Sequence, residues 1–219
     1  SRCMAIDEGD AEVPVDQSEI PVTAEEPDSV IRTTGTDHVT LIGSNEEETV
    51  KFYRDVLGMP LVMRQPNLDA PEVTHLFFDS GDGRIITFFV EEGRENAPGQ
   101  RPGIGAVHHL AFSIDAEELS DIKDALSAHG HRFSEFDRGA FHSLYTRDHN
   151  GLTIELVVDK YELPDDRRGE VMALAQSKRV AAGDDYVDDE HMEAAIEDLG
   201  LDVVKHEVPD AATGTGIDG

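Results

Sequence analysis

Three side chains able to bind a divalent metal lie in short apolar segments of the sequence, and two of them, both histidines, occupy matching places. His38 and His109 each stand near the start of a short apolar run of strand type, and Glu155 lies within another, LTIELVV at 152–158. Alternate side chains of a strand share one face of a sheet. A carboxylate in so apolar a strand is costly unless it is paired or coordinated. Two imidazoles and one carboxylate hold a metal and leave positions open, as in non-haem Fe(II) oxygenases, so the sequence predicts such a site.

The matching places follow from an internal repeat within residues 36–160. The pattern predicts for the first copy a strand, a helix and three strands, at 37–42, 45–57, 61–64, 74–79 and 84–90. The second copy repeats this order at 107–112, 117–129, 132–137, 141–147 and 152–158. Both helices are followed by a glycine, Gly58 and Gly130, as is common at helix ends. We expect an α+β fold in which two tandem βαβββ modules form a half-open mixed β-barrel.

The two copies differ where it matters for a metal. Thr87 stands in the first copy at the place of Glu155 in the second. A neutral hydroxyl is a poor metal ligand, so we expect three protein ligands, His38, His109 and Glu155, and not four. Each of them alone would more often be an ordinary polar group of a sheet. A metal site is favoured because the two histidines match through the repeat and Glu155 lies on the strand that completes the second copy.

Strand pairing adds candidate groups beside the metal. If the last hairpin pairs positions that sum to about 300, Tyr145 lies opposite Glu155, and the same offset places His75 on the corresponding face of the first module. A phenol and an imidazole there could exchange protons with a bound phenolate. His108 adjoins His109, and although alternation turns it to the opposite face, we retain it as a further candidate. The alternative for all three is a polar side chain without a catalytic role.

The repeat also divides the chain. Residues 1–35 form an acidic, Pro-rich arm, 36–92 the first module, 93–105 a Gly- and Pro-containing linker and 106–160 the second module. Residues 161–219 form an acidic extension with helices expected at 163–182 and 188–199, followed by a tail.

Charge excludes several classes of partner. The 219 residues contain 47 Asp and Glu against 18 Lys and Arg, a net charge of −29. Such a surplus repels nucleic acid and anionic membranes, and no apolar run has the length of a membrane span. A single cysteine, Cys3, excludes an intramolecular disulfide framework. We expect a cytoplasmic protein, and few lysines beside many acids are typical of the saline cytoplasm of a halophile.

The sequence resembles the vicinal oxygen chelate superfamily of glyoxalases, fosfomycin- and bleomycin-resistance proteins and extradiol dioxygenases. The resemblance rests on DHVTL at 37–41, FYRDVLG at 52–58, VHHLAF at 107–112 and GLTIEL at 151–156. Segments NLDAP at 67–71, THLFF at 74–78 and DRGAFHSLY at 137–145 are closest to the branch that cleaves hydroquinone or catechol rings. Asp37 is a departure, because many such enzymes have a second histidine there.

The resemblance implies an activity. It implies Fe(II), or else Mn(II), on His38, His109 and Glu155, with Tyr145 and Arg138 beside the metal. The expected function is an extradiol-type dioxygenase that cleaves a dihydroxybenzene with O₂. The alternatives are a non-redox glyoxalase-like isomerase or lyase, and a non-catalytic binding or resistance protein. The partners expected are a small aromatic substrate, O₂ and, as one option, a second copy in a homodimer.

Overall fold

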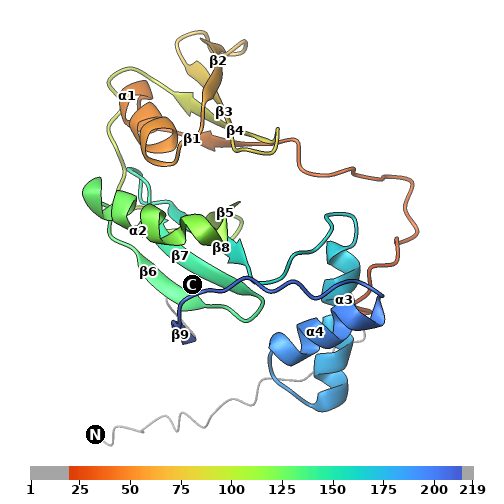
Figure 1. Ribbon diagram of the computed structural model, residues 1–219. Coiled ribbons are helices and arrows are strands. Elements are labelled where there is room, and N and C mark those ends of the chain that lie inside the picture. The colour runs from red at the N-terminus through yellow and green to blue at the C-terminus, as the bar shows by residue number, and fades with distance from the viewer. Residues whose placement is uncertain (1–19, 214–219) are drawn as a thin grey trace, which may run out of the picture. The chain divides into compact units, whose positions relative to one another are not determined.

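The computed structural model describes residues 20–213, whose helices and strands are drawn in Figure 1. Its contacts divide the described chain into two compact units, one of residues 28–159 with 207–213 and one of residues 20–27 with 160–206. Within the described residues, no helix is long and apolar enough to cross a membrane.

The first module forms a four-stranded sheet. Its elements are β1 (His38–Ile42), α1 (Glu46–Val50), the π-helical continuation η1 (Lys51–Val56), β2 (Leu61–Pro66), β3 (Thr74–Asp79) and β4 (Ile85–Val90). The strand order is β1-β4-β3-β2, with β1 parallel to β4 and the other pairs antiparallel. The helix begins after Asn45, whose side-chain oxygen accepts a hydrogen bond from the backbone N–H of Glu48 at 3.0 Å. This N-cap satisfies one of the backbone donors that a helix start leaves unpaired.

The second module repeats this topology. Its elements are β5 (His109–Ser113), the 3₁₀ turn η2 (Ala116–Glu118), α2 (Leu119–Ala128), β6 (Ser134–Asp137), β7 (Phe141–Arg147) and β8 (Thr153–Asp159). The strand order is β5-β8-β7-β6-β9, in which β9 (Ala212–Thr213) comes from the C-terminal tail and pairs in parallel with β6. The predicted α+β fold of two βαβββ modules is confirmed. The sheets are open, and no strand pairing joins them in the described residues.

The predicted hairpin registers are also confirmed. Tyr145 lies opposite Glu155 in the β7–β8 pair, and Phe77 lies opposite Thr87 in the β3–β4 pair. Thr87 therefore occupies in the first sheet the position that Glu155 occupies in the second.

One hydrophobic core serves both modules. In β8 the side chains of Ile154, Leu156 and Val158 are buried in it, whereas Glu155 points to the other face because successive side chains alternate. The helices contribute Phe52, Tyr53, Leu119 and Leu126 to the same cluster. Each large apolar side chain buried there stabilises the fold by about 1.5–3 kcal/mol. The core thus takes one face of each sheet and leaves the opposite face for polar groups.

A buried hydrogen bond connects the two modules. The Tyr53 hydroxyl on η1 donates to Oδ2 of Asp148 at 2.8 Å, and Oδ1 of Asp148 accepts the backbone N–H groups of Asn150 and Leu152. Burial, and then the neighbouring Asp148 carboxylate, raises the pKa of the Tyr53 phenol well above its usual value. The tyrosine therefore keeps its proton and acts as a hydrogen-bond donor.

The linker is attached to the same turn. The Ala97 N–H donates to Oδ1 of Asn150 at 2.9 Å, and the Gln100 side chain donates to the Asn150 carbonyl at 2.8 Å. A Cβ at Gly151 would lie 2.4 Å from the carbonyl oxygen of Pro98, and Gly151 has φ +77°. Only glycine fits this close approach of two backbones.

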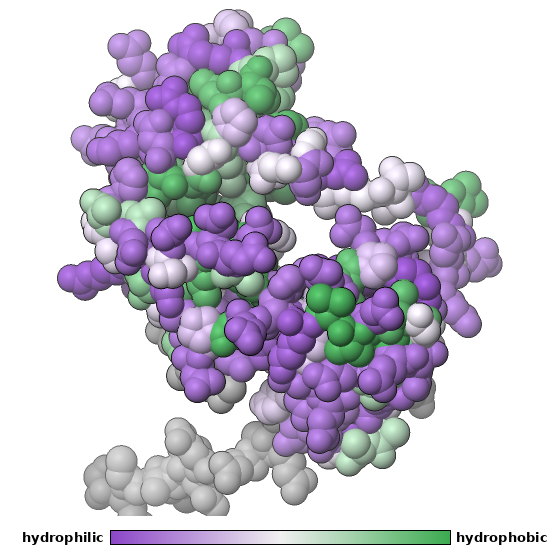
Figure 2. All heavy atoms as spheres, in the orientation of Figure 1, coloured by the Kyte–Doolittle hydropathy of each residue, from purple (hydrophilic) through white to green (hydrophobic). Residues whose placement is uncertain are grey.

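The second unit contains the two predicted C-terminal helices, α3 (Arg168–Ala182) and α4 (Asp189–Asp198). α3 begins five residues later than predicted, because Pro164 opens a turn in which the Arg167 N–H donates to its carbonyl. Small and apolar side chains of both helices form the buried interior, namely Val171, Ala175, Met192, Ala195 and Ile196. Hydrophilic side chains cover most of the face visible in Figure 2, as the acidic composition predicts.

Replacing Tyr53 by Phe tests the connection between the modules. We expect the free energy of unfolding to fall by about 1–3 kcal/mol, because the ring is kept but a buried oxygen of Asp148 loses its hydrogen bond. Urea unfolding followed by circular dichroism measures the change. Tyr186→Phe, at a tyrosine that is 72% exposed, is the control and should change stability by less than about 0.5 kcal/mol. Equal stability of the wild-type and Tyr53→Phe proteins would contradict this assignment.

Candidate functional site

The polar face of the second sheet gathers around the Glu155 carboxylate. Glu155 is only 8% exposed. Its Oε2 lies 3.0 Å from Nε2 of His109 on β5, and its Oε1 accepts hydrogen bonds from Ser143 at 2.6 Å and from Tyr145 at 3.1 Å, both on β7. These three partners offset the cost of burying a charged carboxylate. The sequence singled out His109, Glu155 and Tyr145 but not Ser143, which lies two residues before Tyr145 and therefore on the same face.

Tyr145 is held as a proton donor. Burial, and then the negative charge of Glu155, raises the pKa of its phenol above the usual value. The Arg138 guanidinium lies over the Tyr145 ring, with its central carbon 5.7 Å from the ring centre. Arg138 is thus beside Tyr145, whereas a place for both beside a metal stays an expectation from the resemblance.

His108 contacts His109 directly, with 3.0 Å between their Nδ1 atoms. β5 begins only at His109, so strand alternation does not turn His108 to the opposite face as expected. If Nε2 of His109 carries a proton toward Glu155, Nδ1 of His109 must accept from His108. A cation on Nε2 of His109 would move that proton to Nδ1 and reverse this hydrogen bond.

The corresponding face of the first sheet contains a chain of hydrogen bonds. Thr87 on β4 donates to Thr40 on β1 at 2.7 Å, and its hydroxyl oxygen lies 2.8 Å from Nε2 of His75 on β3. Since the Thr87 proton is already donated, His75 is the donor to Thr87. Burial, and then the nearby His38, lowers the pKa of His75, so that its imidazole is neutral at pH 7. The rings of Phe77 and Phe89 lie beside His75, with ring centres 4.0 and 4.6 Å away.

His38 lies apart from the other two candidate ligands. Its side chain is 53% exposed, and Nδ1 is 2.6 Å from Oδ1 of Asp37. Among the described residues, the only three His, Cys, Asp or Glu side chains with ligand atoms within 4.8 Å of one another are Asp184, Asp188 and His191. The structure therefore brings His109 and Glu155 together and does not bring His38 to them.

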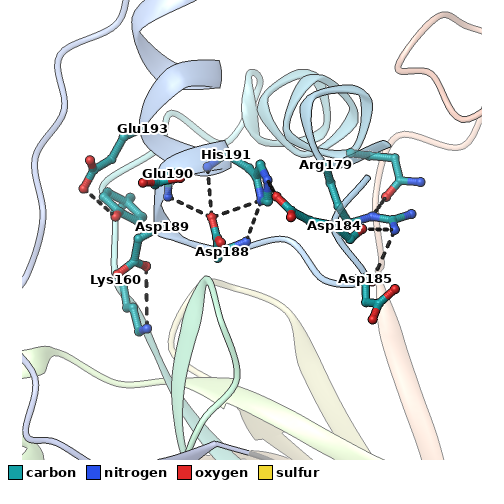
Figure 3. Close-up of polar contacts among 11 residues, drawn as sticks. Lys160, Arg179, Asp184, Asp185, Asp188, Asp189, Glu190, His191 and Glu193 are labelled. Carbon is teal, nitrogen blue, oxygen red and sulfur yellow. Dashed lines mark hydrogen bonds and ion pairs between the residues drawn. The ribbon is translucent and has the colours of Figure 1, made fainter. Parts of the chain in front are cut away.

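The Asp184, Asp188 and His191 cluster is explained by a helix start. Oδ1 of Asp188 accepts the backbone N–H groups of Glu190 and His191, and Nδ1 of His191 accepts the N–H of Asp188 (Figure 3). Nε2 of His191 lies 2.7 Å from Asp184. Both ring nitrogens are thereby engaged, and the reciprocal bonds form a capping box in which histidine replaces the usual glutamate. We assign this cluster to the start of α4 and not to a metal.

A duplicated βαβββ module with a histidine–carboxylate pair on its polar face defines a class of protein with many activities. The model of the Glyoxalase/Bleomycin resistance protein/Dioxygenase superfamily matches residues 35–156, more than half of the chain. The chain therefore belongs to this superfamily, and the resemblance found in the sequence is confirmed.

Two curated relatives and one crystal structure match part of the chain. "Putative ring-cleaving dioxygenase MhqE" of Bacillus subtilis (strain 168) is 34% identical over 103 residues, which cover 46% of this chain and 33% of the relative. "Putative ring-cleaving dioxygenase MhqA" of the same strain is 33% identical over 115 residues, covering 52% and 36%. The chain thus spans about a third of the length of these relatives. The crystal structure of a "putative dioxygenase" from Bacillus subtilis matches with a TM-score of 0.51 and 29% identity, covering 57% of this chain and 41% of that one.

Substitution of Asp188 separates a helix cap from a metal ligand. Asp188→Ala should lower the free energy of unfolding by about 0.5–2 kcal/mol, because two backbone N–H groups lose their acceptor. Urea unfolding should give the same loss of stability with and without EDTA. Asp185→Ala is the control. Asp185 accepts a hydrogen bond from Arg179 through its backbone carbonyl, which the substitution keeps. If EDTA lowered the stability of the wild-type protein by the same amount, the cluster would be assigned to a metal instead.

Proposed function

We propose that this protein is a metal-dependent ring-cleaving dioxygenase that acts on a dihydroxybenzene with O₂. One observation carries the proposal: a buried carboxylate, Glu155, shares its two oxygens between a strand histidine and the Tyr145 hydroxyl on the polar face of a superfamily module. The names of the curated relatives support the reaction class, although the chain covers only about a third of their length.

The donor atoms suit Fe(II) or Mn(II). Ser143 and Tyr145 occupy Oε1 of Glu155, so Oε2 and Nε2 of His109 are the atoms that would hold the ion. Nδ1 of His38 is engaged by Asp37, which leaves its Nε2 as the third donor. A carboxylate behind a ligating imidazole fixes its orientation and tautomer, so Asp37 would serve this role. When bound, the metal would supply the redox centre through which the ring passes electrons to O₂.

The surrounding side chains would bind the ring and move protons. His75, neutral at pH 7, would accept a proton from a ring hydroxyl through Nδ1, and Tyr145, which keeps its proton, would donate to an anionic oxygen. Arg138 beside Tyr145 would stabilise the same negative charge, and His108 would relay the proton that His109 releases on binding the metal. Phe77 and Phe89, which flank His75, would form an apolar wall for a flat ring.

His38 must reach His109 and Glu155 for the three-ligand set to form. β1 and β5, which carry the two histidines, are edge strands of their sheets. Closer approach of these edges within one chain would complete the site. A homodimer in which His38 of a second copy meets the His109–Glu155 pair is the alternative. A cytoplasmic location and a saline habitat stay predictions from the sequence.

Oxygen uptake tests the reaction. Protein reconstituted anaerobically with Fe(II) should consume O₂ when hydroquinone or catechol is added, as followed with an oxygen electrode. Glu155→Gln should abolish uptake and weaken Mn(II) binding, measured by electron paramagnetic resonance, by more than about 100-fold, because a ligand charge is lost.

The matched control is Glu135→Gln. The Glu135 carboxylate lies 2.7 Å from the buried His142, on the face of β6 and β7 opposite to the one that carries Tyr145. Its neutralisation should therefore leave O₂ uptake and Mn(II) binding unchanged. Absence of uptake with every diphenol in Fe-loaded protein would refute the dioxygenase and favour a non-redox glyoxalase-like enzyme or a binding protein.

Complementation decides how His38 joins the site. His38→Ala and Glu155→Ala proteins should each be inactive, because each lacks one ligand. If the ligands come from two copies, a mixture unfolded and refolded together should regain activity through hybrid dimers with one intact site. If they come from one chain, the mixture should remain as inactive as its components, with wild-type protein refolded alongside as the control.

A further inference from the structure

A cavity of about 640 Å³ opens where the two modules and the linker meet. Its walls include Thr40 of β1, Arg101 of the linker, His108, and Arg147 and Thr153 of the β7–β8 hairpin. Cavities of this size hold small organic ligands. Thr40 accepts from Thr87 and His108 contacts His109, so the cavity adjoins the polar faces of both modules.

Arg147 belongs to the same strand face as the candidate site. It is two residues from Tyr145 on β7 and pairs with Thr153, which itself pairs with His109 of β5. Two residues along a strand span about 7 Å. The Arg147 side chain therefore starts two residues along β7 from Tyr145, on the same face of the sheet.

Among the described residues, neither cavity arginine has an acidic partner. Within residues 20–213, neither the Arg101 nor the Arg147 side chain has a hydrogen bond or an ion pair, whereas Arg54, Arg64, Arg94 and Arg167 each contact a carboxylate. The one carboxylate in the cavity wall, Asp148, is engaged by Tyr53 and by two backbone N–H groups. In the described part of the chain, this wall therefore contains two arginines that no carboxylate contacts.

We propose that Arg101 and Arg147 bind a carboxylate carried by the aromatic substrate. The planar guanidinium donates parallel hydrogen bonds that match a carboxylate, and two of them give the cavity a positive potential. The acidic remainder of the chain would repel such an anion, so the arginines select where it binds. This inference rests on the proposed function, which accounts for the two ring hydroxyls. With the added carboxylate, the substrate class is a dihydroxybenzoate.

Two probes that differ by one carboxylate test the inference. Binding of 2,5-dihydroxybenzoate and of hydroquinone to the full chain, without O₂, is measured by isothermal titration calorimetry. The benzoate should bind at least about tenfold more tightly, as expected for charge-assisted hydrogen bonds. Its advantage should shrink as KCl is raised, because salt screens exposed charges.

Arginine variants locate the effect. Arg147→Gln and Arg101→Gln should each reduce the affinity for 2,5-dihydroxybenzoate by about tenfold and leave that for hydroquinone unchanged. Arg54→Gln, at an exposed arginine paired with Asp55, is the control and should change neither affinity. Equal affinity for the two probes, no binding of the benzoate, or full retention of its advantage in both cavity variants would overturn the inference. Because no turnover is measured, a protein that selects the benzoate but consumes no O₂ would refute only the dioxygenase.

Discussion

The Glu155 carboxylate is buried in an otherwise apolar strand, and its placement constrains the rest of the second module. Burial of a charge requires partners on several sides, and here β5 supplies His109 while β7 supplies Ser143 and Tyr145. Those partners reach Glu155 only in the observed register, since a slip of one residue would turn the carboxylate into the core. The same network that makes burial tolerable leaves one carboxylate oxygen facing an imidazole.

Duplication of the module provided two equivalent faces that have diverged in chemistry. Thr87 occupies the place of Glu155, and its neutral hydroxyl joins Thr40 and His75 in a chain of hydrogen bonds without a charge. One module therefore offers a carboxylate and an imidazole, and the other a neutral histidine between aromatic rings. Under the proposed function, this asymmetry would provide an open metal position on one side and proton transfer to a flat ring on the other.

The negative charge lies mainly in the segments that flank the modules. The flanking segments 1–35 and 161–219 hold 25 of the 47 acidic residues and only 7 of the 18 basic ones. The modules are less acidic, and two arginines, Arg101 of the linker and Arg147 of β7, line the cavity beside the candidate site. The strong negative charge thus describes mainly the appendages, and a local positive potential can exist beside the site in an acidic protein.

The sequence by itself determined the modules, the hairpin registers and the faces of Thr87, Tyr145 and Glu155, because these follow from local periodicity and from hairpin offsets. It singled out His109, Glu155 and Tyr145 as candidate site residues before any contact was known. Only the tertiary structure decided which groups meet: that Ser143 satisfies Glu155, that His108 precedes β5 and contacts His109, and that His38 lies apart. These depend on distances between strands far apart in sequence and on the packing of two modules against one core, which periodicity does not encode.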